Sequence, residues 1–347
     1  MTIEELSKSE GIWGSEESDN DDIVLKSSIR FIRNIGGYVF PRCLSGDQRD
    51  KVAGSLIKRI EENEDCTDSS FINLQSCSPV DRHILFERNI INDMIHDNGE
   101  MEKSTLVLSK KQNHFYLLNV RDHLQLIINH SGFHFKDIYI FGKKTISKIE
   151  DGIGFAFTAE RGYLTSNPDF SGSGIEMSAT LHLAEYLYPG TINEIIVDLK
   201  KRGLALKSSW IDGYYVIVTG NAAGMTDKSV YDMMTEGLKE TIEKERKVRE
   251  EAYDENRTRI EDRVWRSYGL LLSCRTITLF EALDLLSQVR FGVSLGIIGY
   301  LTIKDINVLL YYIQDSHLVK RYGLAEGDGS LENMRAQFIR NYLKEVL

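Results

Sequence analysis

Short apolar runs with a two-residue period fill much of the chain before residue 220 and predict β-strands. The clearest of these runs lie at 106–108, 114–118, 195–197 and 213–218. Two longer segments, 45–62 and 174–187, predict helices between the strands. Because strands and helices do not alternate regularly, the pattern favours an α+β fold whose sheet is largely antiparallel.

The period becomes helical near residue 227. From there apolar residues recur at steps of three and four positions, at Val230, Met233, Met234, Leu238 and Ile242. All 4 prolines lie before residue 190, so none interrupts this helical part. We therefore divide the chain into an acidic mobile tail at 1–22, an α+β domain at 23–226 and an all-α domain at 227–347.

Three later helices of the all-α domain have recognisable starts. A Ser or Thr followed three positions later by an acidic or amide residue is typical of a helix N-terminus. The pattern is a capping box at Thr278–Glu281, with weaker versions at Thr302–Asp305 and Ser330–Asn333.

The composition is that of a globular protein, with 347 residues of which 42% are hydrophobic and 27% charged. A formal net charge of -10 repels phosphate backbones and argues against nucleic acid as a partner. No apolar stretch suits a transmembrane helix and the acidic N-terminus does not resemble a signal peptide, so we expect a cytoplasmic protein without membrane contact. Cys43, Cys66, Cys77 and Cys274 fall at no metal-binding spacing, so we expect reduced thiols and no metal site.

The run Ser171-Gly172-Ser173-Gly174 comes directly before residues predicted to be helical. Backbone N–H groups at such a place can bind a phosphate. No lysine follows the run, however, and Glu176 would put a carboxylate into the first turn, where it competes with an anion. The run therefore has two interpretations, a phosphate cradle and a structural turn.

Two further pairs carry possible chemistry. Asp122 beside His123 is compatible with an oriented general base and equally with a structural pair at the end of a β run. Arg30 and Arg33 suit an anion and equally suit surface ion pairs. None of these patterns alone defines an activity.

Four segments, taken together and in order, resemble the bacterial protein-arginine kinases of the McsB type, relatives of the phosphagen kinases. They lie at 23–34, 117–127, 160–183 and 260–271. The resemblance runs from about residue 22 to the end of the chain. It implies an antiparallel sheet flanked by helices, followed by a helical domain. The implied activity is transfer of the γ-phosphoryl group of ATP to a guanidinium, in which arginines hold the triphosphate and carboxylates orient the guanidinium.

The positions that the resemblance marks as catalytic have changed. The family motif Asn-Glu-Glu-Asp-His-x-Arg has Val120 and Arg121 here in place of both glutamates. Asn167 stands where the family motif Thr-Ser-Cys-Pro has its cysteine. Three residues of the motif Asn-Glu-Glu-Asp-His-x-Arg are unchanged, namely Asn119, Asp122 and His123.

The positions that the resemblance marks as nucleotide-binding have also changed, with one exception. The motif Ser-Ser-Arg-x-Arg keeps its second arginine as Arg30. At the other five positions the family has four arginines and one histidine, and all five are replaced here. In chain order, the six positions are Ser28, Arg30, Asn89, Gln125, Glu176 and Lys207.

These losses point to a pseudokinase, a kinase fold without catalysis, that acts as a regulatory or adaptor protein. Loss of a general base costs roughly 10²–10⁴ in rate, and loss of each charged donor about 10²–10³. The alternative is an active protein-arginine kinase that uses the substituted residues. We expect no cofactor for the pseudokinase and MgATP for the alternative. The resemblance also implies a homodimer, an McsA-type activator and a Clp-type AAA+ unfoldase as partners.

The helical domain of the family carries a phosphoarginine pocket with the motif Arg-Asp-x-x-Arg-Ala. The matching stretch here is 331–336, in which only the second arginine, Arg335, and the alanine remain. Arg275 and Arg340 are further candidates for such a pocket. The competing interpretation places Arg335 and Arg340 on a solvated face of the last helix.

Two charge reversals suggest a hypothesis. Arg121 replaces a glutamate and Glu176 replaces an arginine, at positions that line the same cleft in the family. If both side chains reach into that cleft, they can pair within about 6 Å and close it.

Overall fold

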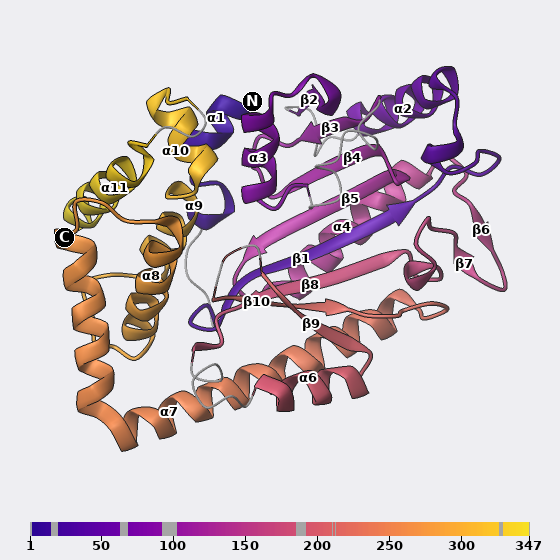
Figure 1. The fold of residues 1–347 in the computed structure, drawn as a ribbon. Coiled ribbons are helices and arrows are strands. Elements are labelled where there is room, and N and C mark those ends of the chain that lie inside the picture. The colour runs from indigo at the N-terminus through magenta and orange to yellow at the C-terminus, as the bar shows by residue number, and fades with distance from the viewer. Residues whose placement is uncertain are drawn as a thin grey trace.

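An eight-stranded antiparallel sheet forms the centre of the larger part of the molecule (Figure 1). The computed structural model describes residues 2–14, 20–62, 69–91, 103–184, 192–209, 211, 213–325 and 329–346. The strand order is β2-β3-β4-β5-β1-β8-β10-β9. The strands are β1 Val24–Arg33, β2 Ser70–Asn73, β3 Thr105–Leu108, β4 His114–Val120, β5 Asp122–Ser131, β8 Ile175–Leu181, β9 Leu204–Ser208 and β10 Tyr215–Thr219. A separate small hairpin pairs β6 Phe157–Thr158 with β7 Gly162–Tyr163.

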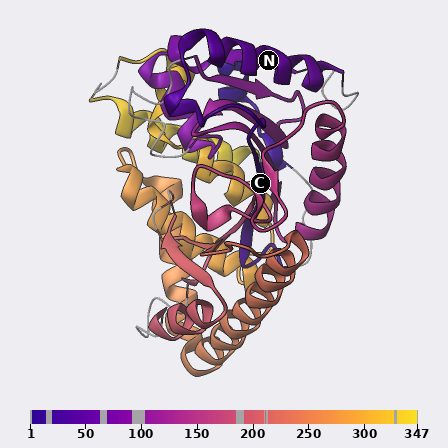
Figure 2. The ribbon, with the colours of Figure 1, turned by 90° about the vertical axis from the view of Figure 1, so that its right-hand side faces the viewer.

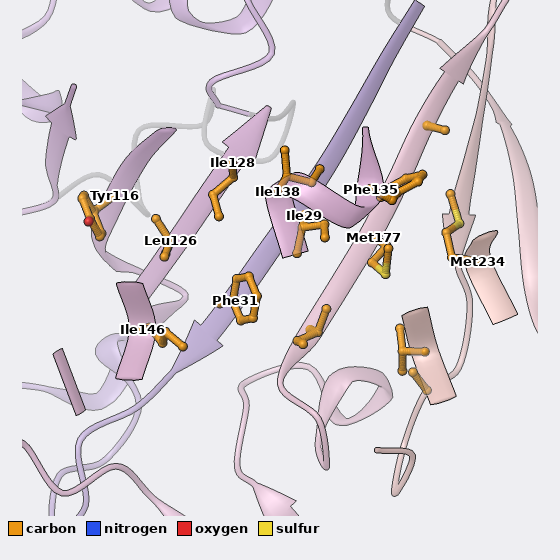
Figure 3. Close-up of a cluster of buried hydrophobic side chains, with 14 of the residues drawn as sticks. Ile29, Phe31, Tyr116, Leu126, Ile128, Phe135, Ile138, Ile146, Met177 and Met234 are labelled. Atoms are coloured by element: carbon orange, nitrogen blue, oxygen red, sulfur yellow. The ribbon is translucent and has the colours of Figure 1, made fainter. Parts of the chain in front are cut away.

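One face of the sheet is covered by helices, which lie on the same side of it in Figure 2. These helices are α2 Gly46–Glu61, α4 Phe135–Glu150 and the first half of α7 Asp227–Ser273. Alternate strand residues such as Ile29, Phe31 and Met177 point into this layer and form its core with α4 (Figure 3). The intervening residues of the same strands therefore point to the opposite face.

Two sequence predictions inside this domain are wrong. Residues 175–181, expected to be helical, form the strand β8, because Ile175, Met177 and Ala179 alternate and bury one face. Residues 195–197, expected to be a strand, lie in the helix α6 Ile192–Lys201. There Ile195 and Leu199 are buried four positions apart, which is the helical spacing.

The helical part consists of the second half of α7 together with four more helices, as expected from the fold class. They are α8 Leu279–Ser294, α9 Ile303–Tyr312, α10 Asp315–Tyr322 and α11 Leu331–Glu345. The helix α7 bends at Asn256, whose backbone is not helical (φ -133°, ψ 33°). Apolar residues before the bend, up to Ile242, belong to the sheet core, whereas Ile260 and Val264 belong to the helical core. Within α7 the sheet core extends to Val248, and the helical core begins at Ala252, just before the bend.

The three expected helix starts are in place, but their caps differ from the prediction. Thr302 and Asp305 form the complete capping box, with both side chains bonded to the backbone of the other residue. Thr278 accepts only the backbone N–H of Glu281. Ser330 makes no side-chain cap.

Part of the N-terminal segment that was expected to be a mobile tail is helical and packs against the rest of the molecule. Residues Ile3–Lys8 form the helix α1, with a complete capping box between Thr2 and Glu5. Leu6 is 1% exposed and packs in a third apolar cluster with residues of α3 Pro79–Glu87. Within the described part of the chain, no helix is both long and apolar enough to cross a bilayer.

Candidate functional site

Five of the six nucleotide-binding positions suggested by the resemblance converge on the face of the sheet opposite α4. Residues that pair across neighbouring strands share a face, as do alternate residues of one strand. Arg30 pairs with Glu176, and Ser28 lies two positions away on the same strand. Gln125 pairs with Ile32 of that strand. Lys207 lies on the same face as well. It pairs across the strands with Val216, which pairs with Thr180, which in turn pairs with Lys26 of β1.

The surviving arginine of this face is already neutralised. The Nη1 atom of Arg30 lies 3.3 Å from Oε2 of Glu176, and the two side chains are only 25% and 23% exposed. The Nε atom of Arg30 is buried and has no hydrogen-bond partner. A cation that the resemblance assigns to a triphosphate thus has an internal carboxylate as its counterion.

Glu176 therefore has a different partner from the one that we expected, Arg121. Arg121 occupies the single-residue turn between β4 and β5, with a positive φ of 59°. Its turn lies about 20 Å along β5 from Ile127, the residue opposite Arg30, at roughly 3.3 Å per residue. The register of the sheet thus separates the two charges that the hypothesis paired.

The first of the two glutamate positions is closed by apolar packing. Val120 is 1% exposed and belongs to the apolar cluster that includes Ile84 and Leu85 of α3 and Ile127 of β5. The side-chain amide of Gln125 donates to the carbonyl of Val120 at 2.7 Å. Neither residue leaves a carboxylate or a cation for a substrate at this place.

Asp122 ties three segments together. Its Oδ1 atom accepts from Nδ2 of Asn34 at 2.6 Å and from the backbone N–H of Ser166 at 2.7 Å. Its Oδ2 atom accepts from the hydroxyl of Ser166 at 2.8 Å. The carboxylate therefore holds the end of β1 and the loop before Asn167 against the β4–β5 turn. Asn34, which sequence reasoning missed, is the partner that makes this arrangement.

His123 is a buried structural residue and not an exposed base. Its Nδ1 atom accepts the backbone N–H of Ile35 at 2.9 Å, which leaves Nε2 to donate to the carbonyl of Val39 at 3.0 Å. Burial lowers the pKa of the ring, so the neutral form that these two bonds require is favoured. The structural alternative for the Asp122–His123 pair is thus the one that the contacts support.

The other marked positions have separate surroundings. Asn119 is buried with a positive φ of 59°, and its Nδ2 donates to the carbonyl of Arg49 at 3.0 Å. Asn167 is exposed and caps a short 3-10 helix by accepting the N–H of Asp169 at 3.1 Å. Asn89 follows α3 with a positive φ of 54°.

A buried lysine on the same sheet face escaped the sequence analysis. Lys26 is 2% exposed and precedes Ser28 by two positions on β1. Burial, together with the nearby charge of Arg30, lowers its pKa to about 7. The available signal was the two-residue period of the strand, which places Lys26 on the same face as Ser28 and Arg30.

The Ser171–Gly174 run is not a phosphate cradle. It leads into the strand β8, and the backbone N–H groups of Ser171, Gly172 and Gly174 already donate to the carbonyls of Pro168, Tyr163 and Phe170. Nη1 of Arg33 donates to the carbonyls of Ile32 at 2.8 Å and Gly174 at 3.1 Å, and its guanidinium lies 3.5 Å from the ring centre of Tyr163. Arg33 is thus a buried structural residue, and the run accepts a cation.

The candidate phosphoarginine residues do not form a common pocket lined by free guanidinium groups. Arg335 is 2% exposed, and it donates to the carbonyls of Ile313 and Ile277, both at 3.0 Å, and to Asp315. The expectation of a solvated face is therefore wrong for Arg335. Arg340 donates to the carbonyl of Cys274, and Arg275 is exposed.

Nothing in the described residues suggests a metal centre. No group of three or more His, Cys, Asp or Glu side chains in the described ranges is arranged to hold a metal ion. Cys43, Cys77 and Cys274 are free thiols, and Cys66 lies outside the described residues.

Comparison with known proteins defines the class. The ATP:guanido phosphotransferase C-terminal catalytic domain matches residues 51–248, which is more than half of the chain. The McsB protein-arginine kinase C-terminal domain matches residues 257–347, and the interval between the two matches contains the bend of α7. The chain belongs to the ATP:guanido phosphotransferase family.

Its relatives are bacterial protein-arginine kinases. The chain is 29% identical over 346 residues to the protein-arginine kinase of Desulforamulus reducens, with 96% of each chain covered. It is 28% identical to that of Bacillus subtilis, with 95% of this chain and 93% of the other covered.

Solved structures of phosphagen kinases confirm the predicted fold class. The duplicated taurocyamine kinase of Schistosoma mansoni superposes with a TM-score of 0.59 at 20% identity, over 68% of this chain and 35% of that one. Lombricine kinase gives a TM-score of 0.57 at 16% identity, over 68% of both chains.

Proposed function

We propose that this protein is a catalytically inactive member of the protein-arginine kinases that acts in the cytoplasm as a regulatory or adaptor protein. The observation that carries the proposal is the ion pair between Arg30 and Glu176. The one arginine that the family motif retains is held by a carboxylate from the neighbouring strand. A triphosphate entering there would have to displace that carboxylate and overcome its negative charge.

The catalytic positions support the same proposal. Val120 is buried among apolar side chains, and Arg121 would repel a cationic guanidinium. Loss of a base and of several phosphate donors removes factors of roughly 10²–10⁴ and 10²–10³ each. Such effects are not additive, so the factors cannot be multiplied into one loss of rate. We expect phosphoryl transfer to be undetectable.

Binding of MgATP tests the proposal. A kinase with an ATP dissociation constant of about 0.1 mM would gain about 1.4 kcal/mol of stability at 1 mM ligand. We expect no shift of the melting temperature for this protein and no phosphate on an arginine-rich peptide. Stabilisation by MgATP together with acid-labile phosphate on the peptide would overturn the proposal.

A charge-reversal variant sharpens this test. Glu176→Arg removes the counterion of Arg30 and restores a cation at a family position, so we expect it to acquire a MgATP-dependent shift that the parent lacks. Glu160→Arg makes the same change of charge at an exposed turn of the β6–β7 hairpin and should acquire none. A shift of equal size in both variants would mean that charge in general, and not this site, attracts the nucleotide.

The second candidate is an active kinase with substituted residues. Lys207 favours it, because it is exposed on the sheet face of Arg30 and could contact phosphates. Under this alternative the parent binds MgATP and Lys207→Ala weakens binding. Under the pseudokinase proposal Lys207→Ala changes nothing.

We also propose that the protein forms a homodimer through its helical part. Five large side chains of its described residues are exposed, namely Trp265, Leu270, Phe280, Tyr300 and Tyr322, at 44%, 49%, 69%, 46% and 40%. Val264, Leu271, Leu285 and Leu286 are buried in the core of the helical part. An McsA-type activator and a Clp-type unfoldase remain proposed partners, as the resemblance implied.

Light scattering tests the dimer. We expect about twice the chain mass of 39.6 kDa for the parent and the single chain mass for Trp265→Ser. Phe157→Ser, which removes an aromatic side chain that is 58% exposed on the β6–β7 hairpin, should leave the dimer intact. A monomeric parent would refute the proposal.

A further inference from the structure

The N-terminal residues touch both bodies of the molecule. We call residues 2–14 and 20–22 the N-terminal strap. Its helix α1 packs against α3 on the sheet side and against α10 on the helical side (Figure 1). The buried side chain of Leu6 lies in the apolar cluster around α3. The strap therefore bridges two bodies that are also connected through α7 and through direct contacts such as that between α3 and α10.

Hydrogen bonds fix the first section of the strap from both sides. From the sheet side, Arg88 donates to the carbonyl of Ser9, and Nε2 of Gln112 donates to the hydroxyl of Ser9 at 2.7 Å. From the helical side, the hydroxyl of Tyr312 donates to the carbonyl of Lys8 at 3.0 Å. Two successive residues of the strap are thus held by different bodies.

Arginines fix the second section in the same way. Before the bend of α7, Arg246 pairs with Oδ1 of Asp22 at 2.9 Å, and Arg249 donates to its carbonyl at 3.2 Å. Beyond the bend, Arg290 of α8 donates to the same carbonyl at 2.7 Å. One backbone oxygen of the strap therefore joins buried guanidinium groups of both bodies.

The covalent connection between the bodies bends at a place that is open to solvent. Residues 254–259 are exposed around Asn256. A surface clip spans the bend, in which Tyr253 and Arg257 both donate to Glu261, at 2.9 and 2.8 Å, and Nη1 of Arg249 before the bend donates to the hydroxyl of Ser294 in α8 at 3.0 Å. The exposed bonds of the clip contribute little to rigidity, so other contacts must set the angle of the bend.

We propose that the N-terminal strap sets the angle between the two bodies, and that lifting it frees the helical part to rotate about Asn256. Direct contacts remain after lifting, since Nδ1 of His317 of α10 donates to Oε2 of Glu87 of α3 at 2.7 Å, and Leu25 of β1 packs in the helical core. The strap thus limits the motion and does not hold the parts together alone. Anything that takes up the strap would act as a conformational switch.

The switch also reaches the candidate site. Arg88, which holds Ser9 of the strap, donates from Nε to His317 at 3.0 Å. It directly precedes Asn89, one of the nucleotide-binding positions suggested by the resemblance. Lifting the strap removes one anchor of Arg88 and so loosens the backbone beside that position. The helical part and the rim of the cleft would respond to the same event.

Hydrogen exchange on the full-length protein tests the proposal. Leu6→Asp places a charge in the apolar cluster, and Arg246→Gln removes the ion pair to Asp22 at a half-exposed position that tolerates change. For both we expect exchange in residues 254–262 and in α10 to rise about tenfold, with unchanged secondary structure by circular dichroism. Trypsin should likewise cut faster after Arg257 and Arg259.

Matched controls make the result specific. Val197→Asp introduces a charge at an exposed apolar residue of α6, and Arg202→Gln removes a surface ion pair to α7 before its bend. Both should exchange at the parental rate around Asn256. If Leu6→Asp prevents folding, hydrogen exchange in the Arg246→Gln variant alone tests the proposal. Exchange confined to residues 2–22 in the strap variants, with α10 and the bend unchanged, would overturn the proposal.

Discussion

Replacing Arg30 or Glu176 by uncharged side chains of similar size should destabilise the fold, and the two losses should not add, because the two side chains interact. At 3.3 Å and an effective dielectric constant of 20, two unit charges attract with about 5 kcal/mol, most of which desolvation offsets. We expect Arg30→Met and Glu176→Gln each to lower the free energy of unfolding by about 1.5–3 kcal/mol, since each leaves a half-buried charge unpaired. The double variant should lose about 1–2 kcal/mol less than the sum.

Urea unfolding followed by far-ultraviolet circular dichroism measures all four proteins of this cycle. A second cycle on Arg202 and Glu240 provides the matched control, because their side chains are 36% and 47% exposed. Such an exposed pair is expected to show a coupling of about 0.2–1 kcal/mol. Raising the salt from 0.1 to 1 M should remove most of the control coupling and leave most of that between Arg30 and Glu176.

The result that refutes the reasoning is a coupling between Arg30 and Glu176 no larger than that of the surface pair. The two groups would then be independent and mainly hydrated. The retained arginine would be available to a phosphate, and the main support for an inactive cleft would be gone.

Three other predictions follow from buried groups and from the backbone. Burial lowers the pKa values of His182 and His317, so below pH 6.5 the unfolded chain binds protons that the folded chain does not. The free energy of unfolding should therefore fall by about 1.4 kcal/mol per pH unit for each histidine. Urea unfolding between pH 7.5 and 5.5 measures this, and a flat profile contradicts it. Arg335→Ala should cost about 3–5 kcal/mol in thermal unfolding because three acceptors lose their donor, whereas the exposed Arg275→Ala should cost nothing measurable. Gly172→Ala should cost about 1–3 kcal/mol in urea unfolding, since the residue has a φ of 120° and a Cβ there would lie 2.8 Å from the backbone nitrogen of Gly224; unchanged stability would show that the turn can rearrange.

Periodicity predicted the elements that bury one face in their own sequence. The helix α2 and the strands β3, β4 and β10 are recognisable in this way. It failed at β8, where glycines followed by Glu176 imitate a helix start although the buried residues alternate. It also failed at 195–197, where three apolar residues in a row fit a strand as well as a helix.

The positions of the candidate site came from the resemblance, but their contacts did not. The pair between Arg30 and Glu176 depends on the register of β1 against β8, which joins residues far apart in the chain. The hypothesis that Glu176 meets Arg121 used a shared cleft and lacked that register. Likewise, the burial of Arg335 depends on carbonyl groups from the distant residues Ile277 and Ile313, which no local pattern announces.

The burial of Val120 bears on how this chain could change over generations. A glutamate restored at that position would have to enter an apolar cluster in which the valine is 1% exposed. A carboxylate without a partner there costs several kcal/mol, or must take up a proton. A lineage that reverted this codon first would lose fold stability and gain no activity. A change back to glutamate at position 120 is therefore disfavoured, since α3 would first have to move away from this position.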